Sequence, residues 1–373
     1  MARHVYVHIP FCEAKCKYCS FFSVASDCQV EAYFDAVRKE VENLTLVSDV
    51  NSDGVDTVYF GGGTPSSVDA HYVCDLLGAI LKKFDINPNT SEITIEVNPH
   101  SLTPAKARAY REAGFNRVSV GVQSLHDKTL KTLGRLHSAS EAVAAILNLK
   151  EAEFINISCD LMLGIPGQTL EELMDDARLL VASGIRHISM YSLSIEEGTP
   201  FEALYPHLED VVPEELERQM YHGLRDYLRS QGINPYEISN CAQKGAESIH
   251  NNSYWEGCEY YGIGAGAHGY LEGSRFGHPD SIKRYIENPL AVEVEETLND
   301  EDKVREYCML QLRTSDGISR TAVKGRFGIC LDDLYKDVIF SNISAGLLED
   351  DGEAVRLTSK GLDLANLVFE DFL

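Results

Sequence analysis

No stretch of this 373-residue chain is apolar for long enough to cross a lipid bilayer. The first ten residues, MARHVYVHIP, also lack the apolar region and the cleavage site of a secretory signal peptide. We therefore expect a cytosolic, cytoplasmic protein without a transmembrane segment. With 44% hydrophobic and 24% charged residues, the chain can bury a large core, and its length predicts a large domain with a smaller one attached.

Positive charge is also scarce. Lys and Arg contribute 33 side chains against 58 from Asp and Glu, which gives a formal net charge of −25 at pH 7. A nucleic-acid-binding surface needs clustered Lys and Arg side chains to contact phosphates. The composition therefore argues against nucleic acid as a partner and suits a soluble enzyme or carrier.

Closely spaced cysteines are missing from the chain except in one place. Cys12, Cys16 and Cys19 lie within eight residues, whereas the other seven of the ten cysteines are scattered singly. In a reducing cytosol such a cluster indicates a metal site or a catalytic site rather than structural disulfides.

Strand-like and helix-like segments alternate six times between residue 3 and about residue 232. The predicted strands are short, rich in β-branched and aromatic residues, and cover residues 4–10, 57–63, 93–99, 117–123, 156–166 and 187–194. Capping boxes predict three helix starts, at Ser26 with Gln29, at Ser138 with Glu141 and at Thr169 with Glu172. This order predicts an α/β fold with right-handed βαβ units and a parallel sheet, either curled as part of a barrel or open and doubly wound.

Polar groups recur at the carboxyl ends of the predicted strands, which is where ligands bind in such folds. Glu96 lies in the third strand and Asp160 in the fifth, where an unpaired buried carboxylate is costly. For either carboxylate alone, a structural ion pair with a neighbouring arginine such as Arg117 or Arg135 is the preferred explanation. Their recurrence at successive strand ends, beside the glycine loop GGGTP at 61–65, favours a polar ligand at one rim.

The three clustered cysteines have two plausible occupants. A structural zinc site wants four closed ligands, usually from two separated pairs, and the chain has no second pair. His8 is nearby but lies within a predicted strand. A [4Fe–4S] cluster on three thiolates would leave one iron without a protein ligand, and therefore open to chemistry.

The spacing Cys-x₃-Cys-x₂-Cys, with Tyr18 before the last cysteine, resembles the signature of the radical S-adenosylmethionine (SAM) superfamily. The resemblance implies a [4Fe–4S] cluster on Cys12, Cys16 and Cys19 whose open iron chelates SAM. It also implies reductive cleavage of SAM to methionine and a 5′-deoxyadenosyl radical, with the protein orienting and shielding the cofactor. The fold it implies is a partial (β/α)₆ radical SAM barrel, in agreement with the six units counted above.

Seven further motifs resemble one branch of that superfamily, which contains oxygen-independent coproporphyrinogen III oxidase and the radical SAM haem chaperones HemW. They are YVHIPFC, FGGGTPS, IEVNP, GVQS, GIPGQT, YEISN and GAGAH, and they span most of the chain. Carried over to matching positions, the resemblance implies SAM contacts at Tyr6, Gly62, Gly63, Thr64, Glu96, Gln123, Arg135 and Asp160. Arg135 rests on its spacing after GVQS alone.

Phe21 separates the two functions within this branch. The oxidase pattern is Cys-x₃-Cys-x₂-Cys-x-Cys, with a fourth cysteine two positions after the third. This chain has Phe21 at that fourth position. The resemblance therefore favours a haem chaperone that binds haem and delivers it to acceptor proteins. Oxidative decarboxylation of coproporphyrinogen III to protoporphyrinogen IX is the alternative, and whether SAM is cleaved productively stays open.

The segment HNNSYW at residues 250–255 resembles the haem-binding motif His-Asn-x-x-Tyr-Trp of the HemW group. An imidazole is a common ligand of haem iron, and Tyr254 and Trp255 offer flat apolar surface to a macrocycle. A lone histidine is otherwise more often hydrogen-bonded inside a structured loop. The resemblance makes His250 the expected haem ligand, with His268 as a second haem-side candidate.

The chain after about residue 290 changes character. Two helix-like segments and a predicted hairpin at 347–358 resemble the winged-helix-like C-terminal domain of the same branch. Residues 291–373 carry 18 acidic and 9 basic side chains, which again disfavours nucleic acid. We expect a barrel at 1–240, a connecting segment at 241–290 and a C-terminal domain at 291–373 that covers the barrel opening or contacts a protein partner. Whether haem drives formation of a homodimer is left open.

Overall fold

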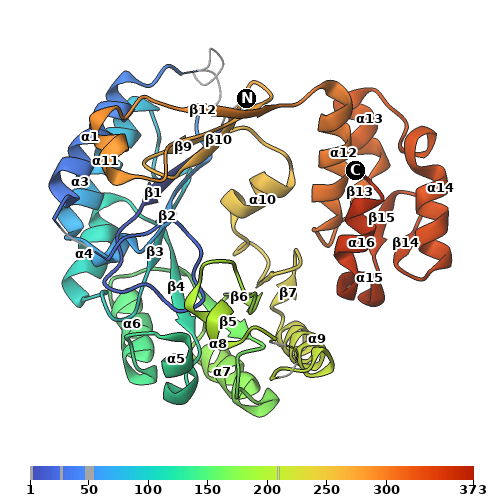
Figure 1. Cartoon of the computed structure of the whole chain (residues 1–373), viewed down its shortest axis with the longest axis horizontal. Helices are drawn as coiled ribbons and strands as arrows, with labels where there is room; N and C mark the ends of the chain where they lie inside the picture. The colour runs from blue at the N-terminus through green and yellow to red at the C-terminus, as the bar shows by residue number, and fades with distance from the viewer. Residues whose placement is uncertain (1–2, 26–27, 47–53, 208, 210) are drawn as a thin grey trace.

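The computed structural model describes residues 3–25, 28–46, 54–207, 209 and 211–373. Within these residues, a 12-stranded sheet occupies the first three quarters of the chain, and a small 3-stranded sheet lies in the C-terminal part (Figure 1). No helix in these ranges is long and apolar enough to span a membrane.

Six parallel strands form the centre of the large sheet, in the order of the sequence. They are β1 (His4–Ile9), β2 (Thr57–Gly62), β3 (Glu92–Val97), β4 (Arg117–Gln123), β5 (Asn156–Leu163) and β6 (His187–Ser192). All six predicted strands are therefore confirmed, each to within about three residues at its ends. The curved arrangement in Figure 1 is the predicted partial (β/α)₆ barrel.

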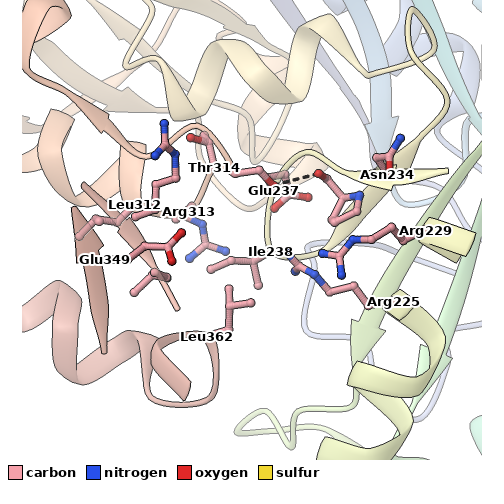
Figure 2. Close-up of a pocket in the computed structure, with 14 residues that line it drawn as sticks. Arg225, Arg229, Asn234, Glu237, Ile238, Leu312, Arg313, Thr314, Glu349 and Leu362 are labelled. Carbon is pink, nitrogen blue, oxygen red and sulfur yellow. Dashed lines mark hydrogen bonds between the residues drawn. The ribbon is translucent and has the colours of Figure 1, made fainter. Parts of the chain in front are cut away.

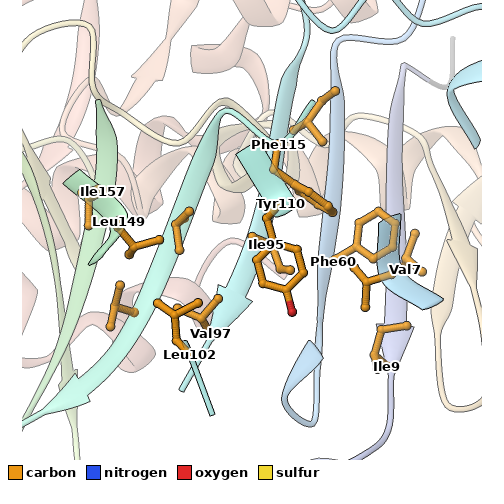
Figure 3. Packing of buried hydrophobic residues seen from close by; sticks show 14 of the residues in the cluster. Val7, Ile9, Phe60, Ile95, Val97, Leu102, Tyr110, Phe115, Leu149 and Ile157 are labelled. Atoms are coloured by element: carbon orange, nitrogen blue, oxygen red, sulfur yellow. The ribbon is translucent and has the colours of Figure 1, made fainter. Parts of the chain in front are cut away.

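Helices cover the outer face of this curved sheet. They are α1 (Val30–Asn43), α3 (Ala70–Lys83), α4 (Pro104–Ala113), α6 (Ala139–Glu151), α7 (Leu170–Ala182) and α9 (Glu214–Ser230). The short helices η1 (Pro65–Ser67), α5 (Asp127–Leu133) and α8 (Pro200–Leu204) lie in the segments that follow β2, β4 and β6. Apolar side chains from strands and helices meet in one core between the two layers, including Val7, Phe60 and Ile95 from strands and Tyr110 from α4 (Figure 3). Burying this apolar surface is the main force that holds the layers together.

The helix starts follow the predicted capping chemistry where they can be compared. Ser138 before α6 and Thr169 before α7 each form a complete capping box with the glutamate three residues later. Ser26, the third predicted cap, lies outside the described residues. Helix α1 begins at Val30 after Gln29, which makes no side-chain capping hydrogen bond.

The segment predicted as a connection also contributes to the large sheet. Strand β9 (Tyr260–Ile263) lies parallel to β1, and it is followed by antiparallel β10 (His268–Leu271) and β11 (Ser274–Gly277). Strand β12 (Glu293–Thr297) also belongs to this sheet, where it pairs with β11, although its residues fall in the range 291–373 predicted for the C-terminal domain. On the other side of the sheet, β8 (Asn240–Ala242) pairs with β6 and β7 (Asn234–Pro235). Helices α10 (Ile249–Trp255) and α11 (Ile282–Glu287) lie in the same segment.

The C-terminal part forms a separate small core. Its elements are α12 (Asp300–Leu312), β13 (Ile318–Ser319), α13 (Arg320–Phe327), α14 (Leu331–Ser344), β14 (Leu348–Asp350), β15 (Ala354–Leu357), α15 (Ser359–Asp363) and α16 (Ala365–Glu370). Three helices followed by the antiparallel hairpin β14–β15 match the predicted winged-helix-like architecture.

The C-terminal part meets the barrel beside α9, β7 and α10 (Figure 1). Backbone hydrogen bonds join the two across the junction, from Ile238 N to Arg313 O at 3.0 Å and from Ser315 N to Tyr236 O at 2.9 Å. A cavity of ≈ 280 Å³ lies at this junction, and Figure 2 shows Arg225 and Arg229 of α9 facing Glu237 and Arg313 across it.

Candidate functional site

A cavity of ≈ 520 Å³ opens at the carboxyl ends of the parallel strands. Cys12, Cys16 and Cys19 line one wall, and the opposite wall comes from β2 to β6. Besides the three thiols, the sequence predicts nine residues that bind SAM or haem. Seven of these nine line the cavity, namely Gly62, Gly63, Thr64, Glu96, Gln123, Arg135 and Asp160. The other two, Tyr6 and His250, do not.

The cysteine loop is held in place by backbone hydrogen bonds at both ends. Cys12 N donates to Val24 O at 3.0 Å, and Val24 N donates to Pro10 O at 2.7 Å, so the loop closes on itself directly after β1. Between these points, Lys17 N donates to Leu133 O at 3.1 Å, at the end of α5. The three thiols are free and half-buried, and burial raises the pKa of Cys12 and of Cys19.

The glycine loop after β2 is packed against the cysteine loop. A Cβ atom on Gly62 would lie 2.6 Å from the His8 ring, and one on Gly63 would lie 2.7 Å from Phe11 O. Gly63 N donates to Ile9 O and Thr64 N to Phe11 O, at 2.9 and 2.7 Å. The N–H groups of Gly63 and Thr64 therefore hold the two loops together.

Glu96 and Asp160 lie on neighbouring parts of the cavity wall without a salt bridge among the described residues. Tyr59 OH donates to Glu96 Oε1 at 2.7 Å, and Ser119 Oγ donates to Asp160 Oδ1 at 3.1 Å. Arg117 pairs with Glu92 at 3.7 Å, so ion pairing does not explain the two carboxylates. Burial raises the pKa of Glu96 to about 7 and also raises the pKa of Asp160.

Two buried polar atoms in the cavity wall have no hydrogen-bond partner in the described part of the chain. They are Gln123 Oε1 and Arg135 Nε. Gln123 also has a positive φ of 65° at a bulge where β4 ends, a conformation that costs a non-glycine residue about 1–2 kcal/mol. Arg135 is fixed by Nη2 donating to Gly121 O at 2.7 Å and Nη1 donating to Cys16 Sγ at 3.4 Å. Unpaired buried groups on a strained backbone mark a place built for a ligand.

Sequence reasoning missed several side chains that line the same wall. Ser119 lies on β4 with Gln123, and Met162 lies on β5 with Asp160. Tyr191 lies on β6, and Asn98 follows β3. Successive side chains in a strand point to opposite faces, so residues two positions from Glu96, Gln123 or Asp160 face the same side. That period of two, applied outward from each polar residue, would have found Asn98, Gly121 and Met162.

Tyr6 lies below the cavity, within the barrel. Its hydroxyl is 3.0 Å from His8 Nδ1, and its ring stacks on that of Tyr59 with 6.3 Å between centroids. His250 lies farther from the cavity, near the opposite end of the strands. Its Nδ1 is 2.6 Å from Thr57 Oγ1, and its backbone N donates to Glu92 Oε1 at 3.0 Å. Thr57 and Glu92 are the first residues of β2 and β3, so α10 lies at the amino ends of the strands.

The imidazole of His250 is buried, with an exposed fraction of 1%, and both ring nitrogens are within hydrogen-bond distance of a partner. Besides Thr57 on Nδ1, Tyr254 OH lies 2.9 Å from Nε2. Burial lowers the pKa of His250 well below its usual value, so the ring is neutral. The described arrangement is thus that of an internal hydrogen-bonded histidine.

The other residues expected near a haem lie in different surroundings. The Trp255 ring packs against the C-terminal part, with the Arg313 guanidinium 4.5 Å from its centroid. His268 is exposed on β10, with Nδ1 3.1 Å from Glu295 Oε1. Phe21, at the position that distinguishes the oxidase, is 68% exposed at the cavity rim.

Comparison with known proteins matches the chain to two family descriptions, the radical SAM superfamily over residues 6–180 and the HemN C-terminal domain over residues 298–364. The heme chaperone HemW of Bacillus subtilis is 35% identical over 100% of this chain and 99% of its own length. The heme chaperone HemW of Lactococcus lactis is 34% identical, over 99% of this chain and 96% of its own length. This chain belongs to the HemW family of radical SAM proteins.

The fold of this HemW-family chain is also that of a solved radical SAM enzyme. Coproporphyrinogen III oxidase (HemN) from Escherichia coli superposes with a TM-score of 0.82 over 100% of this chain and 90% of its own, at 18% sequence identity. At that identity the similarity concerns the fold, including a C-terminal domain.

Radical SAM membership implies a [4Fe–4S] cluster and SAM, and the residues of the cavity fit both groups. Three thiols from one loop line the same cavity, and thiolates are the usual ligands of iron–sulfur clusters; in the described residues no three His, Cys, Asp or Glu side chains are already grouped around one metal position. Glu96, Asp160 and the unpaired Gln123 Oε1 also line the cavity, and the Arg135 guanidinium lies beside Cys16; together these groups suit a ligand with amino, carboxylate and hydroxyl groups.

Proposed function

We propose that this chain is a radical SAM haem chaperone: it binds a [4Fe–4S] cluster, SAM and haem, and it delivers haem to acceptor proteins. The observation that carries the proposal is full-length similarity to curated HemW proteins at 34–35% identity, in a chain whose three thiols share one cavity. In this proposal Cys12, Cys16 and Cys19 ligate the cluster, which supplies an electron to SAM when both are bound.

The proposed SAM contacts are those that the family resemblance implies, and the chemistry of the side chains is consistent with them. Glu96 and Asp160 accept hydrogen bonds from the amino group or the ribose hydroxyls of SAM, and Gln123 Oε1 gains the donor that it lacks in the protein. Arg135 supplies a cation for the carboxylate of SAM. Gly62, Gly63 and Thr64 leave room beside the cluster, and Tyr6 supports this wall from below through Tyr59.

Haem is proposed to bind through His250. In the described structure Nε2 of this ring faces Tyr254 OH, so iron ligation requires that this hydrogen bond be exchanged for iron and that α10 move away from the barrel. Such a movement also gives up the hydrogen bonds from Ile249 N and His250 N to Glu92 and the stacking of the His250 ring on Tyr59. His268, exposed on β10, is the second haem-side candidate.

The proposal is tested by anaerobic titration of cluster-reconstituted protein with hemin, following the Soret band. Saturable binding is expected for the wild type, and the variant His250→Ala is expected to lose it. His187→Ala is the matched control, because His187 is also buried with both ring nitrogens near partners, Ser158 Oγ at 2.6 Å and Tyr236 OH at 2.8 Å. Absence of saturable binding in the wild type contradicts the haem proposal, and equal loss in both variants contradicts ligation by His250.

Two further measurements separate a chaperone from an enzyme of the same fold. Transfer of haem from the loaded chain to an apo-acceptor, seen as a shift of the Soret band, supports delivery. Anaerobic formation of protoporphyrinogen IX from coproporphyrinogen III, with SAM and a reductant, would instead support the oxidase. Light scattering with and without hemin then decides whether haem drives formation of a homodimer.

A further inference from the structure

The interior of the barrel contains a continuous column of side chains between its two ends. At the amino end, the ring of His250 stacks on that of Tyr59, with 4.9 Å between centroids and an angle of 23° between planes. At the carboxyl end, Tyr59 OH donates to Glu96 Oε1 at 2.7 Å. Tyr59 therefore contacts both His250 of the HNNSYW segment and Glu96, which lines the cavity that contains the thiols.

Two features show that this contact is built closely into the fold. A Cβ atom on Gly61 would lie 2.9 Å from Tyr59 Cε1 and 3.1 Å from Glu96 Cδ, so the pair fits only because residue 61 has no side chain. A small polar cavity of ≈ 30 Å³, lined by Tyr59, Glu96, Ser248 and Asn251 among others, joins the pair to the start of α10. Glu96 thus borders this small cavity as well as the larger one that contains the thiols.

We propose that Tyr59 is a positioning residue through which helix α10, at the amino end of the barrel, fixes the orientation of Glu96 in the cavity at the carboxyl end. The coupling from His250 to Tyr59 to Glu96 rests on the described residues alone. Its effect on SAM rests on the function proposed above.

The hydrogen bond from Tyr59 OH affects the pKa of Glu96. The titratable groups that face Glu96 come from every element around it: Tyr6 of β1, Tyr59 of β2, Asp160 of β5, Tyr191 of β6 and Tyr254 of α10, with Arg117 of β4 in the same lumen but paired to Glu92. Burial raises the pKa of Glu96, and the Tyr59 hydroxyl and Gly62 N–H oppose this rise. Loss of the Tyr59 hydroxyl therefore favours protonated Glu96 near neutral pH.

The first readout needs no SAM. Infrared absorbance of protonated carboxyl groups is followed against pH in the cluster-loaded chain, with Glu96→Gln identifying the Glu96 band. The midpoint is expected near pH 7 in the wild type and about one pH unit higher in Tyr59→Phe, which keeps the ring and loses only the hydroxyl. His250→Ala is expected to raise it as well, whereas His250→Phe, which restores a stacked ring, is expected to raise it less.

The second readout is the dissociation constant for SAM by equilibrium dialysis. It is expected to rise about tenfold at pH 7 in Tyr59→Phe, with the pH for half-maximal affinity moving upward as the Glu96 midpoint does. Gly61→Ala is expected to weaken SAM binding with the hydroxyl still present, because its Cβ pushes the pair apart. Tyr110→Phe is the matched control, since that buried hydroxyl in α4 has no partner in the described chain.

The measurements test separately the positioning role of Tyr59, its coupling to α10 and the binding of SAM. An unchanged Glu96 midpoint in Tyr59→Phe overturns the positioning role, and an unchanged midpoint in His250→Ala, in protein with a native near-ultraviolet spectrum, overturns the coupling to α10. If the wild-type chain does not bind SAM at all, the proposed function fails, while the Glu96 midpoint still decides the role of Tyr59.

Discussion

At the scale of single residues, Gly62 is a position beside the site where the fold leaves little choice of residue. Its φ is 110°, and a Cβ atom would lie 2.6 Å from the His8 ring. The Nε2 atom of that ring lies 2.9 Å from Phe22 O in the cysteine loop. A side chain here would strain the backbone and also displace the loop that carries the thiols.

We expect Gly62→Ala to lower the free energy of unfolding by about 2 kcal/mol or more. Gly78→Ala is the control, because Gly78 is an exposed residue within α3 with nothing near its Cβ position. Helix propensity predicts that this second change raises the free energy of unfolding by about 1 kcal/mol. Urea denaturation of the two variants measures both effects, and a stable Gly62→Ala variant would contradict the packing described for the loop.

Glu96 makes stability depend on pH in an unusual direction. Its pKa is raised from 4.5 to about 7 in the folded chain, so the folded state binds this proton more tightly than the unfolded state does. The carboxyl therefore favours folding below about pH 4.5, and that contribution is lost as the pH rises to about 7. By this linkage the loss is about 3 kcal/mol.

Glu96→Gln is expected to remove that pH dependence. In SAM-free protein, the variant should gain stability relative to the wild type between pH 5 and pH 8, as measured by urea denaturation at each pH. A constant difference between the two proteins over this range would show that Glu96 titrates normally.

Sequence reasoning located the cavity residues well, because motifs and strand ends are local features. The three thiols were identified from their spacing, and Glu96 and Asp160 from their positions in predicted strands. Contacts that depend on distant residues were not visible in the same way. The stacking of His250 on Tyr59 and the unpaired Gln123 Oε1 arise only when segments far apart in the sequence meet.

At the scale of elements, helix α10 is held in place by charged groups from the parallel strands. The Glu92 carboxylate accepts hydrogen bonds from Ile249 N at 3.2 Å and His250 N at 3.0 Å, at the helix start. Arg117, with an exposed side-chain fraction of 3%, lies 3.7 Å from the same carboxylate, itself 8% exposed. Removing one member of a buried pair leaves the other without a counter-charge.

We expect Glu92→Gln to lower the free energy of unfolding by about 3 kcal/mol. Trp255 ends α10 and is the only tryptophan of the chain, so its fluorescence reports on this helix directly. Glu293→Gln, which alters an exposed pair with Arg284, is expected to change stability by less than about 0.5 kcal/mol. Equal effects of the two substitutions would contradict the anchoring of α10.

The element order of the barrel was predictable because each parallel strand is apolar and each helix has its own boundary residues. The strands β9 to β12 were missed for an opposite reason. Strands β9, β10 and β11 each contain a glycine within four residues, and β12 is exposed throughout, so none shows the pattern of a buried strand. Strand β9 pairs along the edge of β1, and β10, β11 and β12 are then added one after another by antiparallel pairing.

At the scale of the whole molecule, Arg313 connects the two cores. Its guanidinium lies over the Trp255 ring of α10 at 4.5 Å and near the Phe369 ring at 5.8 Å, while its backbone O accepts from Ile238 N. Burial lowers the pKa of Arg313, against the attraction of Glu237. The C-terminal part thus packs on the end of α10, and it lines no part of the cavity that contains the thiols.

Arg313→Met is expected to keep the apolar contact and lose the cation–π interaction, lowering the free energy of unfolding by about 1 kcal/mol. The Trp255 emission maximum is expected to shift, while cluster content and SAM affinity stay at wild-type values because the cavity is elsewhere. A loss of cluster content in this variant would show that the C-terminal part supports the cavity after all.

The proposed function requires that the three thiols and the opposite wall form one site for a cluster and SAM. The most direct test is electron paramagnetic resonance of the reduced, reconstituted chain with and without SAM. We predict a [4Fe–4S] spectrum whose g-values change on addition of SAM, and no cluster signal in Cys16→Ser. A cluster spectrum that is identical with and without saturating SAM would contradict the account.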